Sequence, residues 1–331
     1  MKEQIRLFEI VKTKIPDQLS LADEIEDLLN MSKESVYRRI RGEKLLSFAE
    51  LKTICEKYSL SIDEIINSKS EKGALFEYKP VEISNIENYA TYMTHLLGKM
   101  NILAEFPLEK ELLYSAQDIP FYHFCKYPDL AYFNLYLWND TLKYDATTFE
   151  RFSNSLDKNK IAPIYEKIYQ AYTSIPTVEI WTEQTIDTTL RLLDYYFESG
   201  RFENKDTVLL LLDRFSTLID NIKQFADEGH KGNKRKVLFS LYSCSVDLEN
   251  NFMLMKKGDE LMCVLKLYAI SRIMTDNESL CLDTKKWIDS LISKSILISG
   301  DRAFKERFQF FQKIKNKIQI LIKKVNGSLI F

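Results

Sequence analysis

Residues that break helices are scarce in this chain. Only 9 glycines and 7 prolines occur among its 331 residues. A sandwich or barrel of many short strands needs turn residues at short intervals, so this scarcity favours long helices. No run of about 18 apolar residues occurs, and the segment after Met1 has no signal-peptide core. We therefore expect no membrane span and a cytoplasmic location.

The residue patterns of several chemistries are also missing. The 5 cysteines are widely spaced without a CxxC pair, which is typical of reduced thiols in a core. No glycine-rich phosphate loop, HExxH or GxSxG motif occurs. His95, His123 and Cys125 have no further ligands at suitable spacing, so we interpret His123 as a core histidine among aromatic residues. The sequence therefore predicts no enzyme, no metal site and no cofactor.

The remaining composition is that of an ordinary folded protein. Hydrophobic residues make up 45% of the chain and charged residues 28%, and the length suits two domains. The net charge is −2. Because lysine and arginine contacts to phosphate supply much of the affinity of DNA-binding proteins, any nucleic-acid surface here has to be local.

The clearest pattern lies in residues 1–68. A first helical stripe ends at Pro16, and a serine followed three residues later by an acid marks further helix starts. These capping-box pairs are Ser20 with Asp23, Ser47 with Glu50, and Ser61 with Glu64. Apolar residues at helical spacing follow each of them, Phe48 among them. Five short helices in so few residues predict a compact bundle.

The second and third of these helices form a candidate helix-turn-helix. Residues 21–29 show the apolar stripe of an amphipathic helix, and Asn30 begins a tight break. Ser32 is the expected N-cap of a third helix over residues 33–41. That helix ends at Gly42, which suits the left-handed conformation after a helix.

The two faces of the third helix differ in chemistry. Val36 and Ile40 point toward the core, and Lys33 and Arg39 lie at the flanks of the opposite face. The candidate DNA-binding residues on that opposite face are Lys33, Glu34, Ser35, Tyr37, Arg38 and Arg41. Arginine pairs with guanine O6 and N7, glutamate accepts from cytosine N4, and tyrosine reaches phosphate or a thymine methyl group. The face therefore suits the major groove, and a charged face exposed only to water is the alternative.

A family resemblance rests on this segment. The run Ser35-Val36-Tyr37-Arg38-Arg39-Ile40-Arg41-Gly42-Glu43, followed by Leu46-Ser47 and by Leu60-Ser61-Ile62-Asp63-Glu64-Ile65, resembles the Xre or lambda-repressor-like helix-turn-helix regulators, in the variant found in Bacteroidetes. The resemblance implies a transcription regulator that binds double-stranded DNA sequence-specifically through the third helix. It places Lys33, Glu34, Tyr37 and Arg38 at base edges. Two positions depart from the family: Asn30 stands where glycine is usual, and Glu26 where a small residue is common.

The rest of the chain is predicted to be mostly helical. Residues 69–80 form the expected linker, and residues 81–331 a domain for sensing or oligomerisation. The predicted helices are Ile86–Leu103, Asp129–Trp138, Ile161–Ile175, Val178–Phe197, Thr207–Phe225, Thr284–Ile296 and Phe304–Val325. Alternation over Val237–Val246, with short apolar runs at Phe252–Met255 and Leu261–Leu267, predicts a small antiparallel meander whose turn uses Gly258. The predicted fold class is mainly α.

Several interpretations of the larger domain stay open. The last helix has an apolar register that predicts either a homodimer seam or packing against its own domain: Phe308, Phe311, Ile318, Ile322 and Val325. Its lysines leave open a place beside DNA or an acidic partner. The basic segment 230–236 is either an exposed loop or a second nucleic-acid contact. The aromatic residues form a core or line a pocket for an unknown ligand. The alternative function is a protein-interaction adaptor whose helical domain docks a partner and whose N-terminal bundle does not bind DNA.

Overall fold

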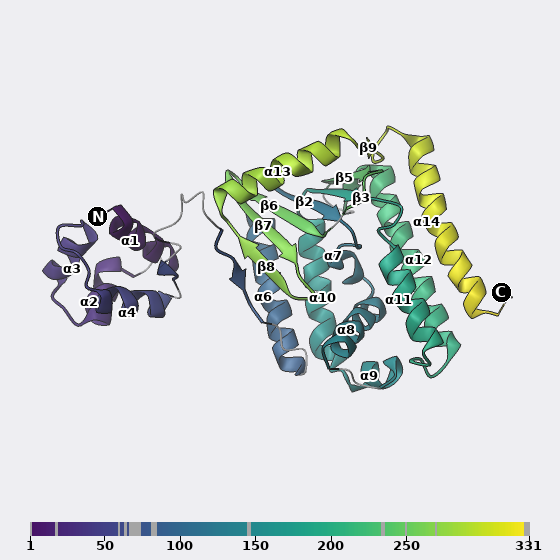
Figure 1. The fold of residues 1–331 in the computed structure, drawn as a ribbon, viewed down its shortest axis with the longest axis horizontal. Coiled ribbons are helices and arrows are strands. Elements are labelled where there is room, and N and C mark those ends of the chain that lie inside the picture. Colours follow the sequence, from purple (N-terminus) through teal and green to yellow (C-terminus); the bar gives the residue numbers. More distant parts are fainter. Residues whose placement is uncertain are drawn as a thin grey trace. The chain divides into compact units, whose positions relative to one another are not determined.

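The computed structural model divides into two compact units, Met1–Leu75 and Phe76–Phe331, and we describe each by itself (Figure 1). The structure describes residues 2–16, 19–58, 60–62, 65, 74–80, 85–143, 147–232, 236–248, 250–268 and 270–327. Of the expected linker 69–80, residues 69–73 lie outside this description. Glu77–Tyr78 form a strand of the second unit.

The first unit is a small helical bundle. Its helices are α1 (Lys2–Lys14), α2 (Leu21–Leu29), α3 (Lys33–Ile40) and α4 (Phe48–Tyr58). One apolar cluster joins them, and Phe8, Ile25, Val36 and Ile54 are buried in it. The predicted fifth helix, with its cap Ser61–Glu64, lies partly outside the described residues, although Ile65 is buried in the same cluster.

The second unit is built on a nine-stranded mixed sheet, so the predicted mainly α class is wrong and the fold is α/β. Its strands are β1 (Glu77–Tyr78), β2 (Lys110–Ala116), β3 (Thr177–Trp181), β4 (His230–Lys231), β5 (Val237–Ser243), β6 (Phe252–Lys257), β7 (Glu260–Lys266), β8 (Arg272–Thr275) and β9 (Ile296–Leu297). Their order is β1-β8-β7-β6-β2-β3-β5-β4, with β9 beside β5. β2, β3 and β5 are parallel to one another, and the other pairs are antiparallel.

Helices cover both faces of this sheet (Figure 1). They are α6 (Ile86–Glu105), α7 (Phe121–Phe124), α8 (Pro128–Lys143), α9 (Phe149–Ser155), α10 (Lys158–Thr173), α11 (Asp187–Glu198), α12 (Lys205–Glu228), α13 (Glu278–Ser293) and α14 (Phe304–Val325). One face packs on α13 through a separate cluster that includes Leu113, Ile180 and Ile288. The opposite face, which we call the helix-side face, packs on α6, α7, α8, α10 and α12 in the main core.

The double cover explains why the central strands were missed. All five residues of β3 are buried, because both of its faces are packed, so the alternation that marks a half-exposed strand is absent. The predicted helix Val178–Phe197 is therefore wrong over its first residues, and α11 begins only at Asp187. The predicted meander is also wrong as drawn. β6 and β7 do form a hairpin that turns at Gly258, with φ of 59°, but β2 and β3 separate β5 from β6.

The last helix is part of the core of its own unit. Phe311 and Ile318 are buried, and α14 packs on α12 and α11. Its lysines pair with acidic side chains of the same unit: Lys313 with Glu183, Lys315 with Asp220, Lys317 with Asp187, and Lys324 with Asp194 and Glu198. Of the residues predicted for a dimer seam, Phe311, Ile318 and Val325 are buried and Ile322 is half-buried within the unit, whereas Phe308 is 63% exposed. The basic character of α14 is matched by acids of neighbouring segments.

Two further observations concern the whole described chain. None of its helices is both long enough and apolar enough to cross a membrane. The five cysteines all fall within the described part, where they are buried and none is bonded to another.

Candidate functional site

The exposed face of α3 carries the residues predicted to contact DNA. The side chains of Arg38 and Arg41 are 54% and 59% exposed, and Lys33 is 49% exposed. Glu34 and Tyr37 are exposed as well, while Ser35 is half-buried. Five of the six candidate residues therefore share one accessible surface, which we call the α3 face.

The turn that presents α3 is fixed by local hydrogen bonds. Asn30 adopts the left-handed conformation (φ 48°, ψ 54°) and donates its backbone N–H to a carbonyl of α2. The departure at Glu26 has a function here, because its carboxylate accepts from the backbone N–H of Lys33 at 3.1 Å. Ser32 occupies the N-cap position, but its hydroxyl donates to the Ser35 hydroxyl instead of capping the backbone. The predicted cap by the Ser32 side chain is therefore wrong.

Arg39 is a structural residue and not a flank of the exposed face. Its side chain is buried, and its guanidinium donates to both oxygens of Glu50 at 2.7 and 3.3 Å. Glu50 also accepts from the Ser47 backbone N–H at 2.7 Å, while the Ser47 hydroxyl accepts from the Glu50 N–H. The capping box predicted at Ser47 is confirmed. Burial raises the pKa of Glu50, but the hydrogen bonds from Arg39 and Ser47 bring it below its usual value.

The charges on the α3 face are held only loosely. Lys33 pairs with Asp23, Arg41 with Glu43 at 2.7 Å, and Arg38 lies 3.9 Å from Glu43. All of these partners are largely exposed, and exposed ion pairs contribute little to stability. Exchanging them for phosphate or base contacts therefore costs the bundle little.

His123 and Glu179 form a hydrogen-bonded pair in the core of the second unit. His123 is buried, and its Nε2 lies 3.0 and 3.2 Å from the carboxylate oxygens of Glu179. That carboxylate also accepts from Tyr172 at 2.6 Å and from Trp181 Nε1 at 2.8 Å. Burial raises the pKa of Glu179, but the neighbouring His123 and these hydrogen bonds outweigh it and lower the pKa. The core interpretation of His123 is confirmed, and an acid inside the apolar run Thr177–Trp181 was the signal for Glu179.

The first two residues of the basic segment 230–236 do not lie in the exposed loop that one interpretation expected. His230–Lys231 form β4, and Lys231 is fully buried. Its ammonium donates to the Tyr172 carbonyl at 2.8 Å and to the Thr177 hydroxyl at 2.6 Å, and burial holds its pKa well below the usual value. Lys231 therefore cannot contact nucleic acid. Residues 233–235 of the segment lie outside the described residues.

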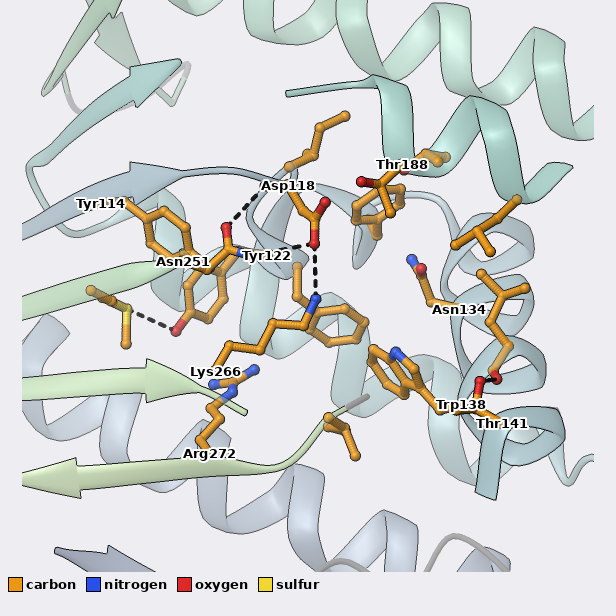
Figure 2. Close-up of a pocket in the computed structure, with 18 of the residues that line it drawn as sticks. Tyr114, Asp118, Tyr122, Asn134, Trp138, Thr141, Thr188, Asn251, Lys266 and Arg272 are labelled. Carbon is orange, nitrogen blue, oxygen red and sulfur yellow. Dashed lines mark hydrogen bonds and ion pairs between the residues drawn. The ribbon is translucent and has the colours of Figure 1, made fainter. Parts of the chain in front are cut away.

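A cavity of about 250 Å³ opens on the helix-side face of the sheet (Figure 2). It lies where the parallel strands β2 and β3 end, a position at which α/β proteins commonly bind ligands. Side chains of β2, β6, β7, β8, α7, α8 and α11 line it. Three lining residues are charged: Asp118, Lys266 and Arg272. The sequence analysis assigned none of them, because they are distant in the chain and fall in no motif.

The charged residues of the cavity are held from several sides. Lys266 donates to Asp118 at 3.1 Å, and the Asn251 amide donates to the same carboxylate at 3.3 Å (Figure 2). Asn251 also accepts from the backbone N–H of Asp118 at 3.0 Å. Asp118 is thus fixed in place before any ligand arrives. Among the described residues, no group of three or more histidine, cysteine or acidic side chains has the arrangement of a metal site.

Comparison with known proteins gives no assignment. No family model, no curated protein and no solved structure matches the chain.

Proposed function

We propose that this chain is a sequence-specific transcription regulator that binds double-stranded DNA with α3 in the major groove. The observation that carries the proposal is the α3 face, on which Tyr37, Arg38 and Arg41 are exposed together. The left-handed Asn30 and the Glu26 contact give α3 a defined start. Arginine in the groove reads guanine by two parallel hydrogen bonds, and the start of a helix attracts phosphate.

The proposal includes a homodimer in the cytoplasm. A single small module buries little surface on DNA, so such proteins commonly bind two half-sites about one helical turn apart. The regulator carries out no chemical step and needs no cofactor in this proposal. Cytoplasmic reducing conditions agree with five cysteines that form no disulfide.

The test is selection of bound sequences from random duplex DNA by the full-length chain. A regulator enriches a defined sequence, and Arg38→Ala weakens binding to it by about 1–3 kcal/mol while relaxing the preference at one base position. Lys52→Ala removes an exposed lysine of α4 and is the matched control, with binding expected to stay unchanged. Selection without enrichment, or equal loss in both variants, contradicts the proposal.

One observation favours the adaptor alternative. Leu45 and Phe48, which follow α3, are 63% and 75% exposed, although Phe48 was expected to lie in the bundle core. Exposed apolar side chains that lie near each other are typical of protein contacts. An adaptor does not bind heparin or duplex DNA through α3. Retention of the wild type on a heparin column, and its loss in Arg38→Ala, therefore favours the regulator over the adaptor.

A further inference from the structure

We propose that the cavity of the second unit binds a small monocarboxylate with an aromatic or apolar body, and that Arg272 holds its carboxylate. This site goes beyond DNA binding and does not depend on it. Three features carry this inference: two adjacent positive charges, an arginine with no acidic partner among the described residues, and a cavity with apolar lining.

The first feature is the pairing of β7 with β8, which brings two cations together. Lys266 of β7 lies directly opposite Arg272 of β8. Val264 and Met274 pack in the main core, and each is two residues away from one of these cations. Because side chains alternate along a strand, both cations lie on the helix-side face. Like charges directly opposite each other destabilise a sheet, so this pair has a cost that an anion would relieve.

The second feature is the charge balance among the residues that line the cavity. Asp118 is the acid in the cavity, and Lys266 already pairs with it at 3.1 Å. Within the described part of the chain, no carboxylate oxygen lies within 4.0 Å of the Arg272 guanidinium. The three charged groups of the cavity therefore leave one positive charge over. Figure 2 shows Arg272 beside the Lys266 side chain, which reaches past it to Asp118.

The phenols around Arg272 do not neutralise this charge. The phenols of Tyr122, Tyr92 and Tyr114 lie near the guanidinium, and the Tyr122 hydroxyl donates to Met253 Sδ at 3.4 Å. Burial raises the pKa of both Tyr122 and Tyr114, so these phenols remain uncharged at neutral pH. A guanidinium has five N–H donors in a planar fork that matches the two oxygens of a carboxylate. A half-buried arginine whose positive charge is not balanced by the phenols is prepared for such a partner.

The third feature is the volume of the cavity and the apolar character of many of its lining side chains. Apolar side chains that line the cavity include Phe121, Trp138, Leu192 and Ile270. Asn134 and Thr188 add polar groups from α8 and α11 (Figure 2). An apolar cavity of roughly 150 Å³ holds benzene, so about 250 Å³ suits a ring with a short acidic side chain, roughly ten to twelve non-hydrogen atoms. One surplus positive charge matches a monocarboxylate better than a phosphate dianion.

The probe is 3-phenylpropanoate, tested on the full-length chain by calorimetry and by tryptophan fluorescence. Trp138 lines the cavity, and all 3 tryptophans lie in the second unit, so the fluorescence reports this unit alone. The expected Kd is about 0.1–1 mM for a ligand of this size. The neutral 3-phenylpropanamide has the same shape and is expected to bind roughly tenfold or more weakly, because it cannot form the charged pair.

Variants separate the carboxylate contact from folding. Arg272→Gln is expected to remove the preference for the acid over the amide, and Arg272→Lys to keep part of it, because the charge stays while the fork is lost. Arg214→Gln changes an exposed arginine of α12 outside the cavity and is the matched control. Should Arg272→Gln fail to fold, Arg272→Lys and the comparison of acid with amide still decide the question.

Each other result overturns the proposal. Equal binding of 3-phenylpropanoate and its amide removes the carboxylate contact, and tighter binding of phenyl phosphate assigns a different head group. No binding of any of the three probes means that Arg272 only packs against the surrounding aromatic side chains. Because the assay contains no DNA, these results are independent of whether α3 binds a duplex.

Discussion

Three arginines in this chain have different roles because their neighbours differ. Arg38 is exposed, and the acid that pairs with it, Glu43, lies 3.9 Å away and is itself exposed, so Arg38 is available to a partner. Arg39, the next residue, is buried and bonded to both oxygens of Glu50, so it holds α3 to α4. Arg272 is half-buried among phenols, and no described carboxylate lies within ion-pair distance of it. Neighbouring charges, and not residue type, distinguish the structural arginine Arg39 from the two for which we propose contacts to DNA and to a ligand.

At the same scale, Glu179 is predicted to stabilise the second unit strongly. Glu179→Gln keeps the shape but turns an amide N–H₂ toward donors that the carboxylate now accepts from, namely His123, Tyr172 and Trp181. We expect the free energy of unfolding to fall by about 2–4 kcal/mol. Urea unfolding of the full-length chain, followed by tryptophan fluorescence, measures this loss. Glu183→Gln, at an exposed residue beyond β3, is the control.

The lowered pKa of Glu179 also sets the direction of a pH effect. The pKa of Glu179 in the folded chain lies below its usual value of 4.5. Between these two pKa values the unfolded chain therefore binds more protons than the folded chain. The contribution of Glu179 is therefore complete above about pH 4.5–5 and is lost as the pH falls through the folded pKa. The difference between wild type and Glu179→Gln is expected to shrink below pH 4.5, and a constant difference would mean that the carboxylate is not charged in the folded chain.

At the scale of elements, the sequence was informative where one face of an element is exposed. The amphipathic helix α2, the left-handed Asn30 and the capping box at Ser47 follow from local pattern alone. β3 does not, because burial on both faces removes its alternation. The cavity is even harder to predict from the sequence. Asp118, Lys266 and Arg272 meet only through the strand order, which no local pattern encodes.

The two serines at helix starts give a matched prediction. Ser47→Ala removes a hydroxyl that accepts a backbone N–H, so we expect a loss of about 1 kcal/mol in the local stability of α4. Ser32→Ala removes only a contact to Ser35, and the Glu26 carboxylate still accepts from Lys33, so a clearly smaller loss is expected. Hydrogen exchange of peptides from residues 33–58 of the full-length chain measures both. Equal protection in the two variants would contradict the different roles.

At the scale of the whole molecule, α14 decides how a dimer can form. The helix has the spacing of a coiled-coil seam, but that spacing alone does not say which surface the seam meets. Here it meets α12 and α11, and four of its lysines pair with acids of α11, α12 and the segment before α11. The proposed homodimer therefore needs another surface, since a side chain buried within its own unit is not available to a second copy.

The double variant Phe311→Glu, Ile318→Glu tests this reading of α14. Each change places a charge where the native side chain is at most 1% exposed, so we expect unfolding of the second unit and not clean dissociation into folded monomers. Phe308→Glu on the same helix is the control, because Phe308 is 63% exposed and its change should leave the unit folded. Light scattering gives the mass of each protein, and circular dichroism with tryptophan fluorescence gives its folded state.

A double variant that remains folded while its mass falls from dimer to monomer would place the interface at the seam and contradict the packing of α14 on α12 and α11. A wild type that is monomeric at all concentrations tested would instead remove the dimer from the proposed function and leave α14 where it is, because its buried face is explained within one chain.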